Sequence, residues 1–112
     1  MTDARLAASV EASSLMRSVT ANGGFATILA KGDAERGALL LIVTERGRQV
    51  ALLERMLNAK GAYEWQQNGV TSDAAASAEW LKKRRRNDPD LWLIELDVPD
   101  AERFIAETTL KG

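Results

Sequence analysis

The side chains best suited to chemistry lie in one stretch near the end of the chain, residues 78–97. Five consecutive basic residues, Lys82 to Arg86, are followed by two aspartates on either side of Pro89. A basic cluster can bind phosphate or another anion, and two neighbouring carboxylates can hold a hard cation such as magnesium. The candidate binding residues are therefore Arg84, Arg85, Arg86, Asp88 and Asp90.

Helical geometry weakens the case for an anion site in the basic run. Successive helical residues are rotated by about 100°, so five in a row encircle the helix and cannot form one stripe. Partners also lie close by, because Glu79 precedes Lys83 by four residues and Arg84 follows Trp80 by four. We favour a solvated helix end that complements the helix dipole. Binding of nucleic acid or of a phosphate ligand through Lys82 to Arg86 is the alternative, and of these two ligands nucleic acid is not the expected one.

The two aspartates have a similar plain interpretation. Metal ligands must converge on one point, whereas the strand that follows Asp90 alternates its side chains between two faces. An Asp-Pro-Asp turn beside arginines is typical of a capped, salt-bridged loop. A carboxylate- or metal-dependent enzyme that uses Asp88 and Asp90 remains a second alternative, and we expect no cofactor and no metal ligand.

The composition excludes several other chemistries. The chain has no cysteine and no histidine, which rules out disulfides, Cys/His zinc sites, and catalytic relays that need either residue. The net charge is −1, so bulk charge does not indicate a polyanion binder. Positive charge is local, because residues 82–90 carry five basic and two acidic side chains.

Residue patterns divide the chain into alternating helical and extended segments. A Gly pair after Asn22 is typical of a helix end, Gly47 suits a hairpin turn, and Asp88 before Pro89 stops a helix. The expected elements are a helix over 4–21, strands over 25–31, 38–44, 49–57 and 62–67, a helix over 74–86, a strand over 91–97, and a last helix opened by Pro99.

These elements predict one α+β domain over residues 1–112, in the order α-β-β-β-β-α-β-α. Short turns between the first four strands favour an antiparallel meander. We expect a mainly antiparallel sheet of about five strands, with the helices packed on one face. Trp92, Ile94 and Leu96 should share the buried face of the last strand.

The block from Lys83 to Asp97 resembles the end of a small, uncharacterised family found mainly in alphaproteobacteria, domain-of-unknown-function family 1491. Shorter segments are similar to that family as well: Gly23 to Ala26, Lys31 to Asp33, and Gly37-Ala38. The resemblance covers nearly the whole chain and implies a bacterial cytoplasmic protein. It implies no activity and no catalytic or binding residue.

The remaining expectation concerns partners. The strand over Ala38 to Val43 is fully apolar, and the first helix has apolar residues on two sides. Together they provide more apolar surface than one sheet face and three helices need to cover. We therefore expect a non-catalytic interaction domain and a homodimer. No apolar run approaches the roughly 18 residues of a membrane span, so a cytoplasmic location without membrane partners is expected.

Overall fold

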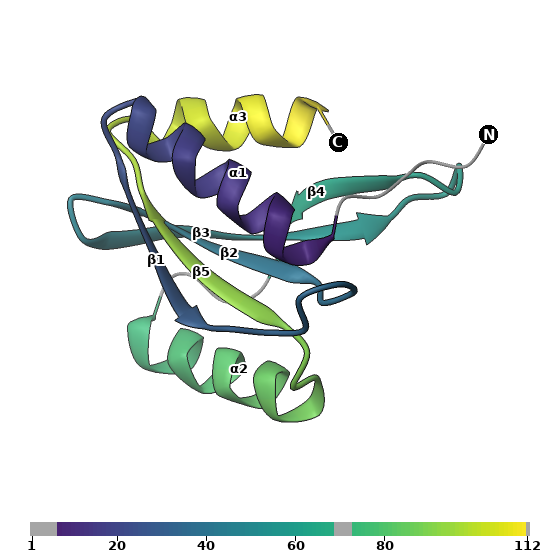
Figure 1. Cartoon of the computed structure of the whole chain (residues 1–112). Helices are drawn as coiled ribbons and strands as arrows, with labels where there is room; N and C mark the ends of the chain where they lie inside the picture. Colours follow the sequence, from purple (N-terminus) through teal and green to yellow (C-terminus); the bar gives the residue numbers. More distant parts are fainter. Residues whose placement is uncertain (1–6, 69–72, 112) are drawn as a thin grey trace.

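The computed structural model describes residues 7–68 and 73–111, and it has the predicted order of elements (Figure 1). Three helices surround one five-stranded sheet. The helices are α1 (Ala8–Ala21), α2 (Ala74–Asn87) and α3 (Ala101–Lys111), and the strands are β1 (Phe25–Ala30), β2 (Leu39–Glu45), β3 (Arg48–Leu57), β4 (Tyr63–Gln67) and β5 (Trp92–Asp97).

The predicted meander is wrong in one respect. The strand order is β1-β5-β2-β3-β4, so the last strand is inserted between the first two. It runs antiparallel to β1 and parallel to β2, with Leu41 level with Ile94. The remaining pairs, β2–β3 and β3–β4, are antiparallel. The sheet is therefore mixed, because a strand distant in sequence is inserted beside β2 and runs parallel to it.

The expectation that all helices pack on one face is also wrong. Helices α1 and α3 lie on one face of the sheet, and α2 lies on the other (Figure 1). Strand β2 explains this arrangement, because its residues are buried from Leu39 to Thr44. A strand that is apolar on both sides needs cover on both faces.

Each face of the sheet has its own core. Along the central strands, buried side chains alternate between the face covered by α1 and α3 and the face covered by α2. The α1/α3 core contains Ala8, Ala12, Val19, Leu39, Leu41, Val43, Ala51, Leu53, Trp92, Ile94, Leu96, Val98 and Ala101. The α2 core contains Leu40, Ile42, Leu52, Leu91 and Leu93, with Trp80 and Leu81 packed against it.

Local signals at the ends of elements behave largely as expected. Gly23 follows the C-cap Asn22 with a positive φ of 88°, and Gly47 has a φ of 79° in the β2–β3 turn. The side chain of Asp73 caps α2 by accepting hydrogen bonds from the N–H groups of Ala75 and Ala76. The last helix begins two residues after Pro99, and Asp100 accepts a hydrogen bond from the N–H of Arg103.

The first helix begins at Ala8, after its N-cap Ala7, and residues 4–6 of its predicted range lie outside the described residues. Val10 is 50 % exposed, so the second apolar side of the helix faces solvent. None of the helices in the described ranges combines the length and apolar character needed to cross a membrane.

Candidate functional site

Arg84 is a structural residue that joins α2 to the sheet. Its Nη1 donates a hydrogen bond to Glu54 Oε1 at 2.7 Å, and Nη2 donates a second to Oε2. The guanidinium also lies 5.4 Å from the ring centre of Trp80, as the sequence predicted. Hydrogen bonding to Arg84 holds the pKa of Glu54 below its ordinary value, and the same bond raises the pKa of Arg84. The positive charge of Arg84 is therefore paired with Glu54 in a bidentate salt bridge.

Arg85 is also used within the fold. Its Nε donates to the carbonyl oxygen of Leu91 at 3.0 Å, and its Nη2 donates to that of Lys31 at 2.9 Å. These two bonds connect the end of α2, the start of β5 and the loop after β1. Backbone carbonyls at element ends need such donors, so the position of Arg85 has a sufficient structural explanation.

The rest of the basic run faces water. Arg86 is exposed and makes no hydrogen bond or ion pair with the described part of the chain. Lys82 lies 4.0 Å from Glu79, and both side chains are more than 70 % exposed. The five basic residues therefore point in different directions and use different partners, and they do not gather on one surface.

The two aspartates organise the turn between α2 and β5. Asp88 Oδ1 accepts a hydrogen bond from the N–H of Asp90, and the carbonyl oxygen of Asp90 accepts one from the N–H of Asp33. Residues 7–68 and 73–111 contain no group of three acidic side chains placed to hold a metal ion. The carboxylates are close in sequence, but the contacts they make are those of a turn.

The same turn receives the loop after β1. Trp92 Nε1 donates to the carbonyl oxygen of Asp33 at 2.7 Å. A Cβ added to Gly32 would lie 2.0 Å from the carbonyl oxygen of Asp90, and one added to Gly37 would lie 2.3 Å from it. Glycine is required at both positions because the two backbones touch. Segments that are more than 50 residues apart thus form one rigid junction.

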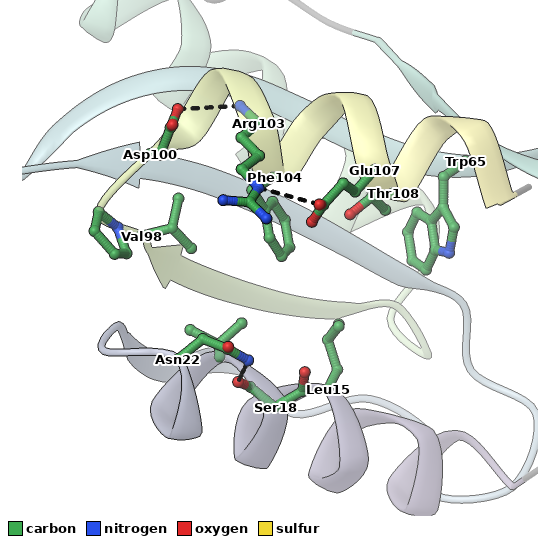
Figure 2. Close-up of a pocket in the computed structure, with 12 residues that line it drawn as sticks. Leu15, Ser18, Asn22, Trp65, Val98, Asp100, Arg103, Phe104, Glu107 and Thr108 are labelled. Atoms are coloured by element: carbon green, nitrogen blue, oxygen red, sulfur yellow. Dashed lines mark hydrogen bonds and ion pairs between the residues drawn. The ribbon is translucent and has the colours of Figure 1, made fainter.

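A different surface offers space for a ligand. A groove of about 500 Å³ runs between α1 and α3, in the volume range of small-molecule sites (Figure 2). Leu15 comes from the α1 side, and Phe104 and Trp65 come from the other (Figure 2). The groove is lined by Leu15, Ser18, Val19, Asn22, Trp65, Val98, Pro99, Asp100, Arg103, Phe104, Glu107 and Thr108.

The aromatic wall of the groove is held in place by charged contacts. Arg55 lies 4.8 Å from the ring centre of Trp65 and forms an ion pair with Glu11 of α1. Trp65 is therefore fixed between a guanidinium and the groove. The charged rim is largely self-neutralised, because Arg103 Nε donates to Glu107 at 3.2 Å. The groove accordingly presents an apolar floor with a polar edge.

Sequence reasoning missed this groove for a clear reason. Phe104 and Thr108 lie on α3 and Trp65 lies on β4, so no spacing in the sequence links them. Only the tertiary arrangement brings them near Leu15. The partial exposure of all four side chains marks a surface that the two helices leave incompletely covered.

Comparison with known proteins agrees with the resemblance seen in the sequence. The sequence profile described as "Protein of unknown function (DUF1491)" matches residues 6–106. The chain belongs to the DUF1491 family. Its resemblance to that family, noted in the block around Arg84 to Trp92, is thereby confirmed.

Solved structures of DUF1491 proteins have the same fold. A crystal structure of a family member from Caulobacter crescentus CB15 is 26% identical, with a TM-score of 0.78 over 87% of this chain and 92% of that chain. An NMR structure from the same organism is 27% identical, with a TM-score of 0.75 over 86% and 88%. The solution structure of protein Atu0922 from A. tumefaciens is 27% identical, with a TM-score of 0.71 over the same shares.

These comparisons identify a family and a fold without an activity. Neither the family description nor the names of the solved structures states a reaction, ligand or partner. No curated protein gives a significant match. The function of this DUF1491 protein therefore has to be argued from its own surfaces.

Proposed function

We propose that this protein is a non-catalytic interaction domain that binds an apolar group of a partner in the groove between α1 and α3. One observation carries the proposal. Trp65 and Phe104 come from a strand and a helix, and they line the same open groove with Leu15. Aromatic side chains that are partly exposed in a concave surface are typical binding anchors.

The distribution of charge supports a neutral, apolar ligand group. Arg103 is the one cation among the groove residues, and Glu107 pairs with it at 3.2 Å. Asp100 is used at the start of α3, where it accepts a hydrogen bond from the N–H of Arg103. An anionic ligand would have to displace Glu107 from Arg103, whereas an apolar group only needs to replace water over Phe104 and Trp65.

The cellular setting is part of the same proposal. The relatives in Caulobacter and Agrobacterium support a bacterial protein, for which we propose a cytoplasmic location. The contacts of Arg84, Arg85 and Asp88 are explained by the fold, so no specific observation favours anion binding or metal-dependent catalysis over the groove.

A neutral naphthylamine dye tests the groove, because its fluorescence rises when it leaves water. Wild type should give a saturable increase. Ser18 lines the groove, so Ser18→Phe should fill part of it and weaken binding by about tenfold, which corresponds to about 1.4 kcal/mol. Ser13 is exposed on the same helix but does not line the groove, so Ser13→Phe is the matched control and should bind like wild type.

Two outcomes would contradict the proposal. The first is the absence of saturable binding by wild-type protein. The second is equal weakening by Ser18→Phe and Ser13→Phe, because a general effect of added surface phenylalanine would explain that result. Circular dichroism of both variants should match wild type, since both serines are exposed.

A further inference from the structure

Strand β1 (Phe25–Ala30) is the outer strand of the sheet on the side of β5, and β5 is its only strand neighbour within the described residues. The backbone groups along its outer edge are thus available to another strand. Three of its apolar side chains face solvent: Phe25 is 74% exposed, Leu29 is 53% exposed and Ile28 is 41% exposed. An open edge and exposed apolar side chains coincide on the same six residues.

The opposite edge of the sheet is protected, which makes β1 unusual within this molecule. Strand β4 has five residues, YEWQQ, and carries a charge and two amides. In contrast, β1 reads FATILA, with no charged residue and no proline. Natural edge strands are normally protected by charge, proline or a covering element. The one protective feature of β1 is a register shift between Ile28 and Ala30, which leaves Phe25 to Ile28 in regular pairing.

The chemistry of β1 suits a second copy of the same chain. In a two-fold symmetric antiparallel pair the strand lies opposite itself, and an uncharged strand then brings no like charges together. Antiparallel pairing also brings the Lys31 end of one copy toward the Phe25 end of the other. The two Lys31 side chains therefore lie at opposite ends of the paired strands and do not face each other.

We propose that β1 pairs antiparallel with β1 of a second copy, so that the two sheets become one continuous sheet in a homodimer. Burial of Phe25 and Leu29 and new backbone hydrogen bonds stabilise this interface, as in other cases of strand addition to a sheet edge. The interface does not use the groove residues Trp65 and Phe104, so it is independent of the proposed binding function.

Light scattering after size-exclusion chromatography tests the dimer across micromolar to millimolar protein concentrations. Wild type should have twice the monomer mass of 12.2 kDa at the upper end. Leu29→Lys should be a folded monomer there, because it places a charge at the interface. Leu57→Lys is the matched control and should remain dimeric. Leu57 is 59% exposed and lies on β3, next to the edge strand opposite β1.

Hydrogen exchange identifies the surface that is buried. Amides of β1 should become more protected as wild-type protein dimerises, and amides of β4 should not change. A wild-type monomer over the whole concentration range would overturn the proposal. So would a Leu29→Lys dimer with wild-type stability, or a dimer in which the exchange of β1 amides is unchanged.

Discussion

Arg84 and Glu54 are thirty residues apart and form a two-bond bridge between α2 and β3. Glu54 pairs with Leu40 in the neighbouring strand and with Gln66 in β4, which places the bridge on the α2 face of the sheet. Its energetic role follows from its surroundings, because the Glu54 side chain is only 13% exposed and the Arg84 side chain 29% exposed. Arg84, which in the sequence suggested an anion site, therefore connects α2 to the sheet.

Removal of this bridge should destabilise the protein. Arg84→Ala leaves the shielded carboxylate of Glu54 without its charged partner, which should lower the free energy of unfolding by about 2 kcal/mol. Urea denaturation followed by tryptophan fluorescence measures the change. Arg103→Ala removes the exposed pair with Glu107 and should cost less than about 0.5 kcal/mol. Equal costs would contradict a special role for Arg84.

The same bridge predicts a pH dependence of stability. The pKa of Glu54 is lowered from 4.5 by its bond to Arg84, so the carboxylate binds protons less readily in the folded state than in the unfolded state. Its contribution is fully present above pH 4.5 and is lost as the pH falls through the lower, folded pKa. The stability difference between wild type and Glu54→Gln should therefore shrink between pH 7 and pH 3.

Urea denaturation of both proteins at several pH values measures this difference. The matched control is Glu107→Gln, whose exposed pair should give a small difference at every pH. If the free energy of unfolding of wild type exceeds that of Glu54→Gln by a constant amount down to pH 3, protonation of Glu54 does not weaken the folded state, and the prediction is wrong.

The junction between the β1 loop and β5 makes a steric prediction. In Gly32→Ala, the new Cβ would meet the carbonyl oxygen of Asp90 at 2.0 Å, so the junction must open. We expect a loss of about 3 kcal/mol or more in the free energy of unfolding. Gly61→Ala is the comparison: its φ of 82° is strained for alanine, but no atom lies within 4 Å, so its cost should be about 1 kcal/mol. A smaller loss for Gly32→Ala than for Gly61→Ala would contradict the close approach.

Adjacent arginines of the basic run should behave differently. Arg85→Gln loses the donors to the carbonyls of Leu91 and Lys31, which should cost about 1–2 kcal/mol in thermal or urea unfolding. Arg86→Gln changes an exposed side chain and should stay within about 0.5 kcal/mol of wild type. If both substitutions are neutral, Arg85 does not hold the junction.

Much of the fold could be predicted because its signals are local. The end of the first helix at Asn22, the turn at Gly47, and the core face of the last strand with Trp92 and Ile94 all follow from short patterns, and the structure confirms them. The continuous apolar run of β2 indicated more apolar surface than one sheet face needs, and in the structure both faces of that strand are buried. That run was compatible with the parallel neighbour it has in β5.

The errors concern relationships between distant segments. Short turns favoured a meander, but the pairing of Leu41 with Ile94 is decided by burial across more than 50 residues. Placement of α2 on the opposite face follows from that pairing, which leaves Leu40 and Ile42 to be covered. The contact of Arg85 with Lys31 and the groove beside Trp65 have no local pattern at all, because each depends on how complete elements pack.

The α1–α3 groove is the proposed ligand surface of this DUF1491 protein. The most direct test is a titration of nitrogen-15-labelled protein with the neutral naphthylamine dye, followed by two-dimensional NMR. Saturable shifts are expected for Leu15, Ser18 and Thr108 and for the indole N–H of Trp65, with Arg84 to Arg86 unchanged. Saturable shifts confined to other surfaces, or no saturable shifts, would contradict it.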